Sequence, residues 1–173
     1  MAIPNPPSDR GQKNIVITGF MGTGKTTVGR RVAELTKRPF VDVDSEIVVR
    51  AGKPIPQIFA EDGEAAFRAM ERELCKELSE KTGLVIATGG GMLVDEQNRN
   101  LMLASSFVVC LDANRETLAA RLRSNSERPL AKNWEAILNS RREAYAAIPT
   151  HVNTTNKLPD QIAQEIIRLW QSA

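Results

Sequence analysis

The sequence has few of the side chains on which metal-binding and hydrolytic chemistry most often depends. It holds one histidine, His151, and two cysteines, Cys75 and Cys110, among 173 residues. A single histidine argues against histidine-based metal clusters and against a Ser-His-Asp triad. The cysteines lie far apart, and Cys110 belongs to the apolar run 107–111, where a thiol acts as a small hydrophobic group. We therefore expect neither a disulfide framework nor a metal centre built on cysteine.

The sequence also lacks a large charge imbalance and a long apolar run. Lys and Arg number 23 against 21 Asp and Glu, so the net charge is only +2. This balance does not indicate binding to nucleic acid or to an anionic membrane. No run approaches the roughly 18 apolar residues of a membrane span. Residues 1–13 hold three prolines and no signal-like apolar stretch, so we expect a disordered arm or a cloning remnant there, on a cytoplasmic protein.

The remaining composition is that of an ordinary folded domain. Hydrophobic residues make up 42% and charged residues 25% of the chain, which is consistent with one packed core over residues 14–173. Short β-branched runs alternate with segments of helical period, and this pattern predicts an α/β fold. We expect a three-layer, doubly wound sandwich around a parallel sheet of five strands, at residues 14–18, 40–43, 84–87, 107–111 and 151–154.

Two helices are marked by their apolar spacing. Residues 63–82 place apolar side chains three or four positions apart, with Asp62 as the expected N-cap and Gly83 as the expected stop. The last helix repeats this spacing from Leu158 to Leu169, and Pro159 suits its first turn.

A phosphate-binding motif follows the first predicted strand. The segment Gly19–Thr26 reads GFMGTGKT, with two glycines and the Lys-Thr pair at the spacing of a P-loop. Glycines allow backbone N–H groups to turn toward phosphate oxygens, and the helix that follows directs its positive end at the same anion. Lys25 would contact the β- and γ-phosphates, and the Thr26 hydroxyl would ligate Mg²⁺. The alternative is a glycine-rich turn with a solvated lysine.

Two carboxylates follow the second predicted strand. Alternation along 40–44 would place Asp42 and Asp44 on one face at the carboxyl edge of the sheet, where α/β proteins bind ligands. Asp42 could hold Mg²⁺ through water, and Asp44 could accept the proton of an acceptor hydroxyl. The alternative is that Asp44 only caps a helix that begins at Ser45.

Several further residues have both a functional and an ordinary interpretation. Arg68 lies four residues after Glu64 and three before Glu71, which is also a common surface ion-pair pattern. Arg141 precedes Tyr145 by four residues and could lie on a solvated helix face. The run 89–91 is three glycines, which permit close approach of a ligand or form a loose connection. Arg128 lies in a polar segment, 124–131, that we expect to be a mobile loop.

Taken together, these motifs resemble the shikimate kinase family from Ile15 to Trp170. The resemblance rests on their order: the P-loop, Asp42-x-Asp44, Phe67-Arg68, the triple glycine, Arg128-Pro129-Leu130, and Arg141 before Tyr145. It implies a P-loop fold similar to nucleoside-monophosphate kinases, with a substrate-binding region at about 44–80 and a lid at about 124–132. The implied activity is ATP-dependent phosphorylation of the 3-hydroxyl of shikimate, a step of aromatic amino acid biosynthesis, by a monomer that uses Mg²⁺.

The resemblance also implies roles for individual residues. Catalysis would fall to Asp44, Lys25 and Arg128, the last acting from the lid. Metal binding would fall to Thr26 directly and to Asp42 through water. ATP would be bound by Gly22, Thr23, Gly24, Lys25, Thr26, Thr27, Arg121, Arg128, Asn153 and Pro159. Shikimate would be bound by Asp44, Phe59, Phe67, Arg68, Glu71, Gly89, Gly90, Gly91 and Arg141, with Arg68 and Arg141 gripping its carboxylate and Glu71 bracing Arg68.

Two departures and two alternatives accompany this resemblance. The family commonly has Leu where this chain has Ala131 in the lid, and often Asp where it has Asn153 in the nucleotide loop.

Another P-loop kinase of small molecules, similar to gluconate kinase, would use the arginines for a different acid. A non-catalytic paralogue that only binds ATP would need neither Asp44 nor the two arginines.

Overall fold

The structure is a computed structural model that describes residues 13–123 and 133–173. Within these ranges it contains one sheet, formed by β1 (Asn14–Gly19), β2 (Phe40–Asp42), β3 (Val85–Ala87), β4 (Ser106–Asp112) and β5 (His151–Asn153). The strand order is β2-β3-β1-β4-β5, and every neighbouring pair is parallel. The predicted five-stranded, doubly wound α/β fold is therefore confirmed. The predicted lid and nearly all of the predicted arm lie outside the described residues.

Helices connect the strands, as parallel pairing requires. The described part of the chain contains α1 (Lys25–Thr36), α2 (Val43–Ala51), α3 (Ile55–Glu61), α4 (Glu64–Ser79), the 3₁₀-helix η1 (Met92–Val94), α5 (Glu96–Ser105), α6 (Arg115–Arg123), α7 (Trp134–Ala146) and α8 (Pro159–Gln171). None of the helices in these two ranges is long and apolar enough to cross a membrane.

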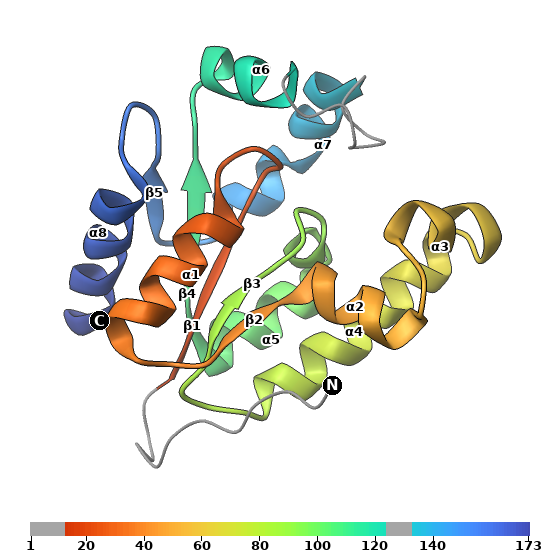
Figure 1. The fold of residues 1–173 in the computed structure, drawn as a ribbon, viewed down its shortest axis with the longest axis horizontal. Coiled ribbons are helices and arrows are strands. Elements are labelled where there is room, and N and C mark those ends of the chain that lie inside the picture. Colours follow the sequence, from red (N-terminus) through yellow and green to blue (C-terminus); the bar gives the residue numbers. More distant parts are fainter. Residues whose placement is uncertain (1–12, 124–132) are drawn as a thin grey trace.

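Helices cover the two faces of the sheet (Figure 1), and a hydrophobic layer packs on each face. On β1, Ile15 and Ile17 pack with Val28 of α1 and Ile162 of α8, whereas Val16 belongs to the layer on the opposite face. That second layer includes α4, α5 and the buried side of α7. All six residues of β1 are buried, as expected for a central parallel strand.

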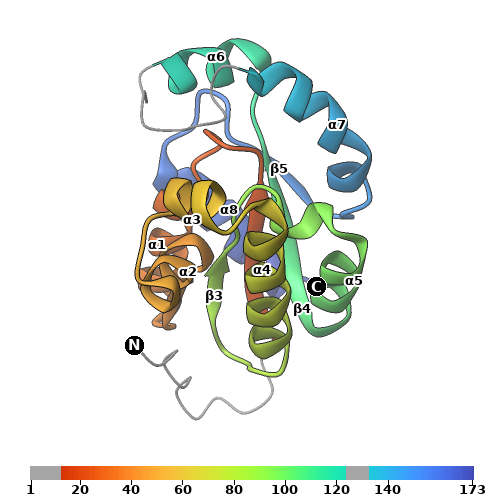
Figure 2. The ribbon, with the colours of Figure 1, turned by 90° about the vertical axis from the view of Figure 1, so that its right-hand side faces the viewer.

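The P-loop, the start of α2 and the triple glycine all follow the carboxyl ends of strands. β1 runs directly into the P-loop, β2 into α2, and β3 into the triple glycine. Figure 2 shows α6 and α7 above this edge, beyond the end of β4. The fold therefore brings segments that are distant in sequence to one edge of the sheet, which is where open α/β sheets bind ligands.

The second predicted strand is shorter than expected, and this corrects the argument for the two carboxylates. β2 ends at Asp42 and α2 begins at Val43, so Asp44 lies in the first helical turn and not on the strand. The Asp42 carboxylate accepts a hydrogen bond from the Ser45 N–H at 3.0 Å and is the N-cap of α2. The capping role considered for Asp44 therefore belongs to Asp42, because only the residue that precedes the helix can accept from its first free N–H groups.

The helix ends also differ from the sequence prediction. α4 begins after Gly63, whose φ of 88° turns the chain sharply, and Asp62 is instead the C-cap of α3. At the other end, α4 stops at Ser79, before the predicted stop at Gly83. Leu158 precedes α8 as its N-cap and is 67% exposed, so it is not part of the apolar stripe.

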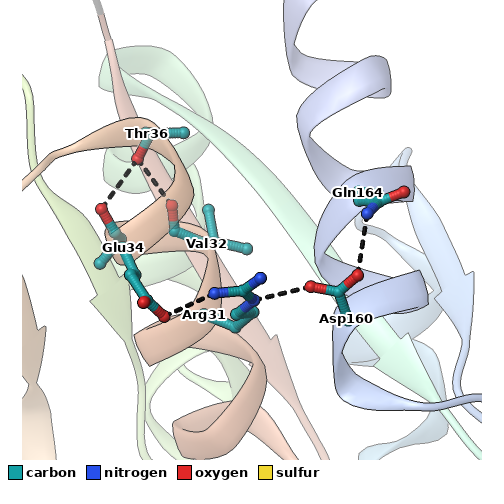
Figure 3. A network of polar contacts seen from close by, with 7 residues as sticks. Arg31, Val32, Glu34, Thr36, Asp160 and Gln164 are labelled. Atoms are coloured by element: carbon teal, nitrogen blue, oxygen red, sulfur yellow. Dashed lines mark hydrogen bonds and ion pairs between the residues drawn. The ribbon is translucent and has the colours of Figure 1, made fainter.

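A polar network joins α1 to α8 on the outside of the sheet (Figure 3). Arg31 donates from Nε to Asp160 at 2.7 Å and from Nη1 to Glu34 at 2.7 Å. Asp160 also accepts from Gln164, and its position in the first turn of α8 suits a negative charge. Because exposed ion pairs contribute little to stability, the apolar contacts beneath the network hold these two helices together.

Candidate active site

A cavity of about 500 Å³ opens at the carboxyl edge of the sheet. It is lined by the P-loop, the start of α2, α3, α4, the triple glycine and α7. The lining residues are Met21, Gly22, Gly24, Lys25, Thr26, Thr27, Asp42, Asp44, Ile55, Pro56, Phe59, Phe67, Arg68, Glu71, Thr88, Gly89, Gly90, Gly91 and Arg141. This volume is within the usual range for the binding site of a small molecule.

The P-loop has the backbone conformation that its glycines make accessible. Gly22 has a φ of 81° and Gly24, the N-cap of α1, a φ of 93°, which a residue with a Cβ rarely adopts. No side chain makes a capping hydrogen bond to the first N–H groups of α1. Lys25 folds back over the loop and donates to the Phe20 carbonyl at 3.0 Å. The segment therefore has the backbone conformation expected of an anion-binding cradle.

Thr26 and Asp42 form a pair of oxygen ligands beside this cradle. The Thr26 hydroxyl donates to Asp42 Oδ2 at 2.8 Å, and Oδ1 of the same carboxylate is held by the Ser45 N–H. Mg²⁺ prefers oxygen ligands and keeps several waters. A hydroxyl and a carboxylate in contact, at a cavity that also holds the phosphate cradle, therefore fit this ion.

Asp44 faces the cavity from the first turn of α2. A Cβ on Gly89 would come within 2.5 Å of its Oδ1, so the triple-glycine loop lies directly against this carboxylate. The position of Asp44 is thus fixed by the helix that Asp42 caps on one side and by bare backbone on the other. The two carboxylates share the cavity, although the strand alternation predicted from the sequence does not bring them there.

Arg68 and Glu71 form a buried ion pair on one turn of α4. Arg68 Nη1 donates to Glu71 Oε1 at 2.5 Å, and the Glu71 side chain is only 2% exposed. Burial raises the pKa of the Glu71 carboxyl, and the Asp44 charge adds to this, while Arg68 acts against it. Glu71 Oε2 has no hydrogen-bond partner among the described residues. The surface ion-pair interpretation of this spacing therefore does not hold for Glu71, which anchors Arg68 from inside the core.

Arg141 is a further cationic side chain of the cavity. It lies on α7, is 9% exposed, and its guanidinium group stands 5.9 Å from the centre of the Phe20 ring. A Cβ on Gly90 would come within 3.0 Å of its Nη1, and one on Gly91 would overlap the Arg68 guanidinium group. The three glycines therefore serve close approach: each faces one charged side chain of the cavity.

The remaining predicted residues lie elsewhere. Thr23 is buried beneath the P-loop, where its hydroxyl donates to the Phe20 carbonyl. Arg121 does not line the cavity, but its Nη1 donates to the Gly22 carbonyl at 2.8 Å. Asn153 ends β5 and Pro159 begins α8, both beyond the cavity lining. Arg128 lies outside the described residues.

Four lining residues were missed by the sequence reasoning: Met21, Ile55, Pro56 and Thr88. Met21 lies within the P-loop motif, at a position that the motif leaves open. Thr88 directly precedes the triple glycine, and its buried hydroxyl donates to that of Thr18 at 2.7 Å. The signal available for Thr88 was its place at the end of a strand beside the glycines.

The structure also brings together three side chains that the sequence separates. Cys110, Asp112 and His151 lie close to one another at the ends of β4 and β5. Both ring nitrogens of His151 already contact oxygen atoms, at 2.7 Å on Asp112 and 2.8 Å on the Ile148 carbonyl. Both ring nitrogens of His151 are therefore engaged by oxygen atoms of the protein.

The fold and the cavity define a class. A P-loop that opens, at the carboxyl edge of a doubly wound parallel sheet, into a pocket with carboxylates and arginines belongs to the P-loop kinases of small molecules. Comparison with known proteins narrows this class. The family model for shikimate kinase matches residues 21–171, and the chain belongs to the shikimate kinase family.

Individual relatives agree with this assignment. The chain is 41% identical over 161 residues to a shikimate kinase from Pelotomaculum thermopropionicum, covering 90% of this chain and 94% of that one. It is 40% identical over 166 residues to one from Geobacter sulfurreducens, covering 92% and 91%.

Solved structures give the same result. Shikimate kinase from Acinetobacter baumannii in complex with shikimate superposes with a TM-score of 0.87 at 35% identity, covering 94% of each chain. A gluconokinase from Sinorhizobium meliloti shares only the fold, with a TM-score of 0.60 at 18% identity.

Proposed function

We propose that this protein transfers the γ-phosphoryl group of ATP to the 3-hydroxyl of shikimate and releases ADP and shikimate 3-phosphate. The observation that carries the proposal is the juxtaposition in one cavity of a P-loop, a carboxylate at Asp44, and two arginine forks at Arg68 and Arg141. Two guanidinium groups suit a substrate that is itself an acid, because a planar fork binds a carboxylate through two hydrogen bonds. Membership of the shikimate kinase family supports the same substrate.

The acid half of the cavity would orient shikimate. Arg68 and Arg141 would hold its carboxylate from two sides, and Glu71 would keep Arg68 in place through the buried ion pair. The aromatic rings of Phe59 and Phe67, whose centroids lie 4.9 Å apart, offer an apolar wall for the carbon ring. Fixing the substrate in this way directs one hydroxyl toward the P-loop, and such alignment is the main contribution that a kinase makes.

The transfer itself then needs little covalent participation by the protein. The shikimate hydroxyl oxygen forms a bond with the γ-phosphorus, the bond from that phosphorus to the bridging oxygen of ADP breaks, and Asp44 takes the hydroxyl proton. Lys25 and the P-loop N–H groups would hold the phosphates. Thr26 and Asp42 would hold Mg²⁺, which when bound neutralises phosphate charge.

An assay of ADP release with shikimate, with gluconate and with no acceptor tests the proposal. We expect turnover that depends on shikimate, and little release without an acceptor. Turnover with gluconate in place of shikimate would assign the chain to another kinase activity. Tight ATP binding with no acceptor-dependent turnover would favour a non-catalytic ATP-binding protein.

A further inference from the structure

Tyr145 lies directly behind the acid half of the cavity without lining it. It occupies α7 one turn after Arg141 and is 6% exposed, packed in the layer that also contains Phe20 and Ile148. Its hydroxyl donates to the Gly90 carbonyl at 2.7 Å. Arg141, on the preceding turn of the same helix, lies near enough for its charge to act on the phenol.

These contacts form a chain from one substrate-facing group to another. The phenol proton goes to the Gly90 carbonyl, which belongs to the loop that faces Arg141. Gly90 in turn lies so close to Arg141 that a Cβ there would come within 3.0 Å of Nη1. The hydroxyl that holds the Gly90 carbonyl therefore also sets how closely the glycine loop approaches the Arg141 guanidinium group.

We propose that Tyr145 is a positioning residue for the substrate carboxylate: its hydroxyl holds the Gly90 carbonyl and so fixes the opening between the Arg141 guanidinium group and the glycine loop. This inference rests on the proposed function, because it assigns Arg141 to the acid. Tyr145 does not line the cavity and is not a catalytic residue.

The hydroxyl is not needed for packing alone. A phenylalanine would fill the same apolar layer, whereas a buried phenol must find a partner for its proton. The partner here is a carbonyl in the middle of the triple glycine, a segment with no side chains of its own to hold it. Without the hydroxyl, that carbonyl would lose a hydrogen bond in a region shielded from water, and the loop beside Arg141 would lose this attachment to α7.

The first test compares Tyr145→Phe with the native protein. We expect the KM for shikimate to rise about three- to tenfold, the fold-change for one neutral hydrogen bond, while the KM for ATP changes little. Ile148→Val is the matched control, because it removes a methyl group beside Tyr145 and leaves the phenol in place. It should lower thermal stability without moving the KM for shikimate.

Two results would overturn the positioning role. One is a Tyr145→Phe variant with an unchanged KM for shikimate. The other is a rise in both KM values that Ile148→Val reproduces at equal loss of stability, which would show that the phenol acts only through packing. If the native protein does not phosphorylate shikimate, the proposed function fails. If it does, and Arg141→Lys weakens shikimate binding while Tyr145→Phe has no effect, only the role of Tyr145 fails.

The phenol also offers a readout that is independent of turnover. Tyr145 is the only tyrosine in the chain, so any tyrosine signal belongs to it. Burial raises the pKa of Tyr145 to about 12, although the charge of Arg141 acts against this. Shikimate, by drawing the Arg141 guanidinium group, should change the ultraviolet difference spectrum of the tyrosine. That band should be missing in Tyr145→Phe, and a tyrosine spectrum unaffected by shikimate would contradict the proposal.

Discussion

The two halves of the cavity are built in different ways. The half that we propose for the nucleotide comes mainly from one continuous segment, 19–27, in which backbone N–H groups act together with the side chains of Lys25 and Thr26. The acid half comes from α2, α4, the loop 89–91 and α7, and there the side chains provide them. A cradle of backbone N–H groups needs only a local conformation, whereas a cage of charged side chains needs the whole fold to bring its members together.

Glycine marks both halves, but for different reasons. Gly22 and Gly24 adopt positive φ, so the backbone conformation requires them. None of the three glycines at 89–91 has a positive φ, and each instead makes room for a charged side chain. Glycine is therefore needed for its backbone conformation in one half and for its lack of a side chain in the other.

The largest expected effect comes from removing the carboxylate of Asp44, which we propose accepts the proton of the substrate hydroxyl. Asp44→Asn should lower kcat by about 10²–10⁴, the usual contribution of a general base, and leave ATP affinity nearly unchanged. Glu73→Gln, an exposed change on α4 with the same loss of charge, is the control. Steady-state kinetics and ATP titration provide the measurement, and near-native turnover in Asp44→Asn would remove this residue from the mechanism.

A smaller effect is expected from changing one arginine fork. Arg68→Lys should raise the KM for shikimate about 10- to 100-fold, because a charged two-point contact is replaced by a single ammonium group. Arg72→Lys lies one turn further on the same helix, where the side chain is 48% exposed and 3.9 Å from Asp95, and should have no effect. Equal KM values in the two variants would place the acid elsewhere.

Replacing one glycine by alanine in each half distinguishes the effect of backbone conformation from the effect of crowding by a side chain. Gly24→Ala meets no crowding, the nearest atom being 3.9 Å away, but its φ of 93° should cost about 1–2 kcal/mol of stability. Gly90→Ala has an ordinary φ and should instead displace Arg141 and raise the KM for shikimate. Thermal unfolding and the KM for shikimate measure these effects in both variants. A rise in the KM for shikimate in Gly24→Ala with only a loss of stability in Gly90→Ala would contradict the prediction.

The last prediction concerns the hydrophobic frame that both halves share. Burial raises the pKa of Cys75 and of Cys110 to about 12. The unfolded thiol ionises first as pH rises, so the stability present below about pH 9 is lost toward pH 12, by about 1.4 kcal/mol per pH unit for each thiol. Cys75→Ala and Cys110→Ala should each reduce this slope by the same amount in denaturant titrations at alkaline pH. If neither variant changes how the free energy of unfolding depends on pH, the prediction is wrong.

Much of the fold follows from local pattern. The strands, the P-loop and the long helix α4 were predicted because periodicity and turn residues act over a few neighbours. The errors lie at junctions. β2 ends at Asp42 because that carboxylate captures the Ser45 N–H and starts a helix, and alternation alone cannot show where a strand gives way to a cap.

The acid half was predicted through family resemblance more than through physics. Periodicity could not show that the Glu71 side chain points into the core while the Glu64 side chain, on the same face of the helix, remains 67% exposed. It also could not show that Asp112 and His151, separated by more than thirty residues, contact each other. Such choices depend on which helix face meets the sheet, and that is decided only by packing.

The sequence alone determined the phosphate cradle, since a positive φ and an N-terminal helix turn are properties of adjacent residues. Only the tertiary structure decided how Asp44, Arg68 and Arg141 come together around the triple glycine. Their spacing along the chain carries no information about their separation, because the parallel sheet brings the ends of distant strands to a single edge.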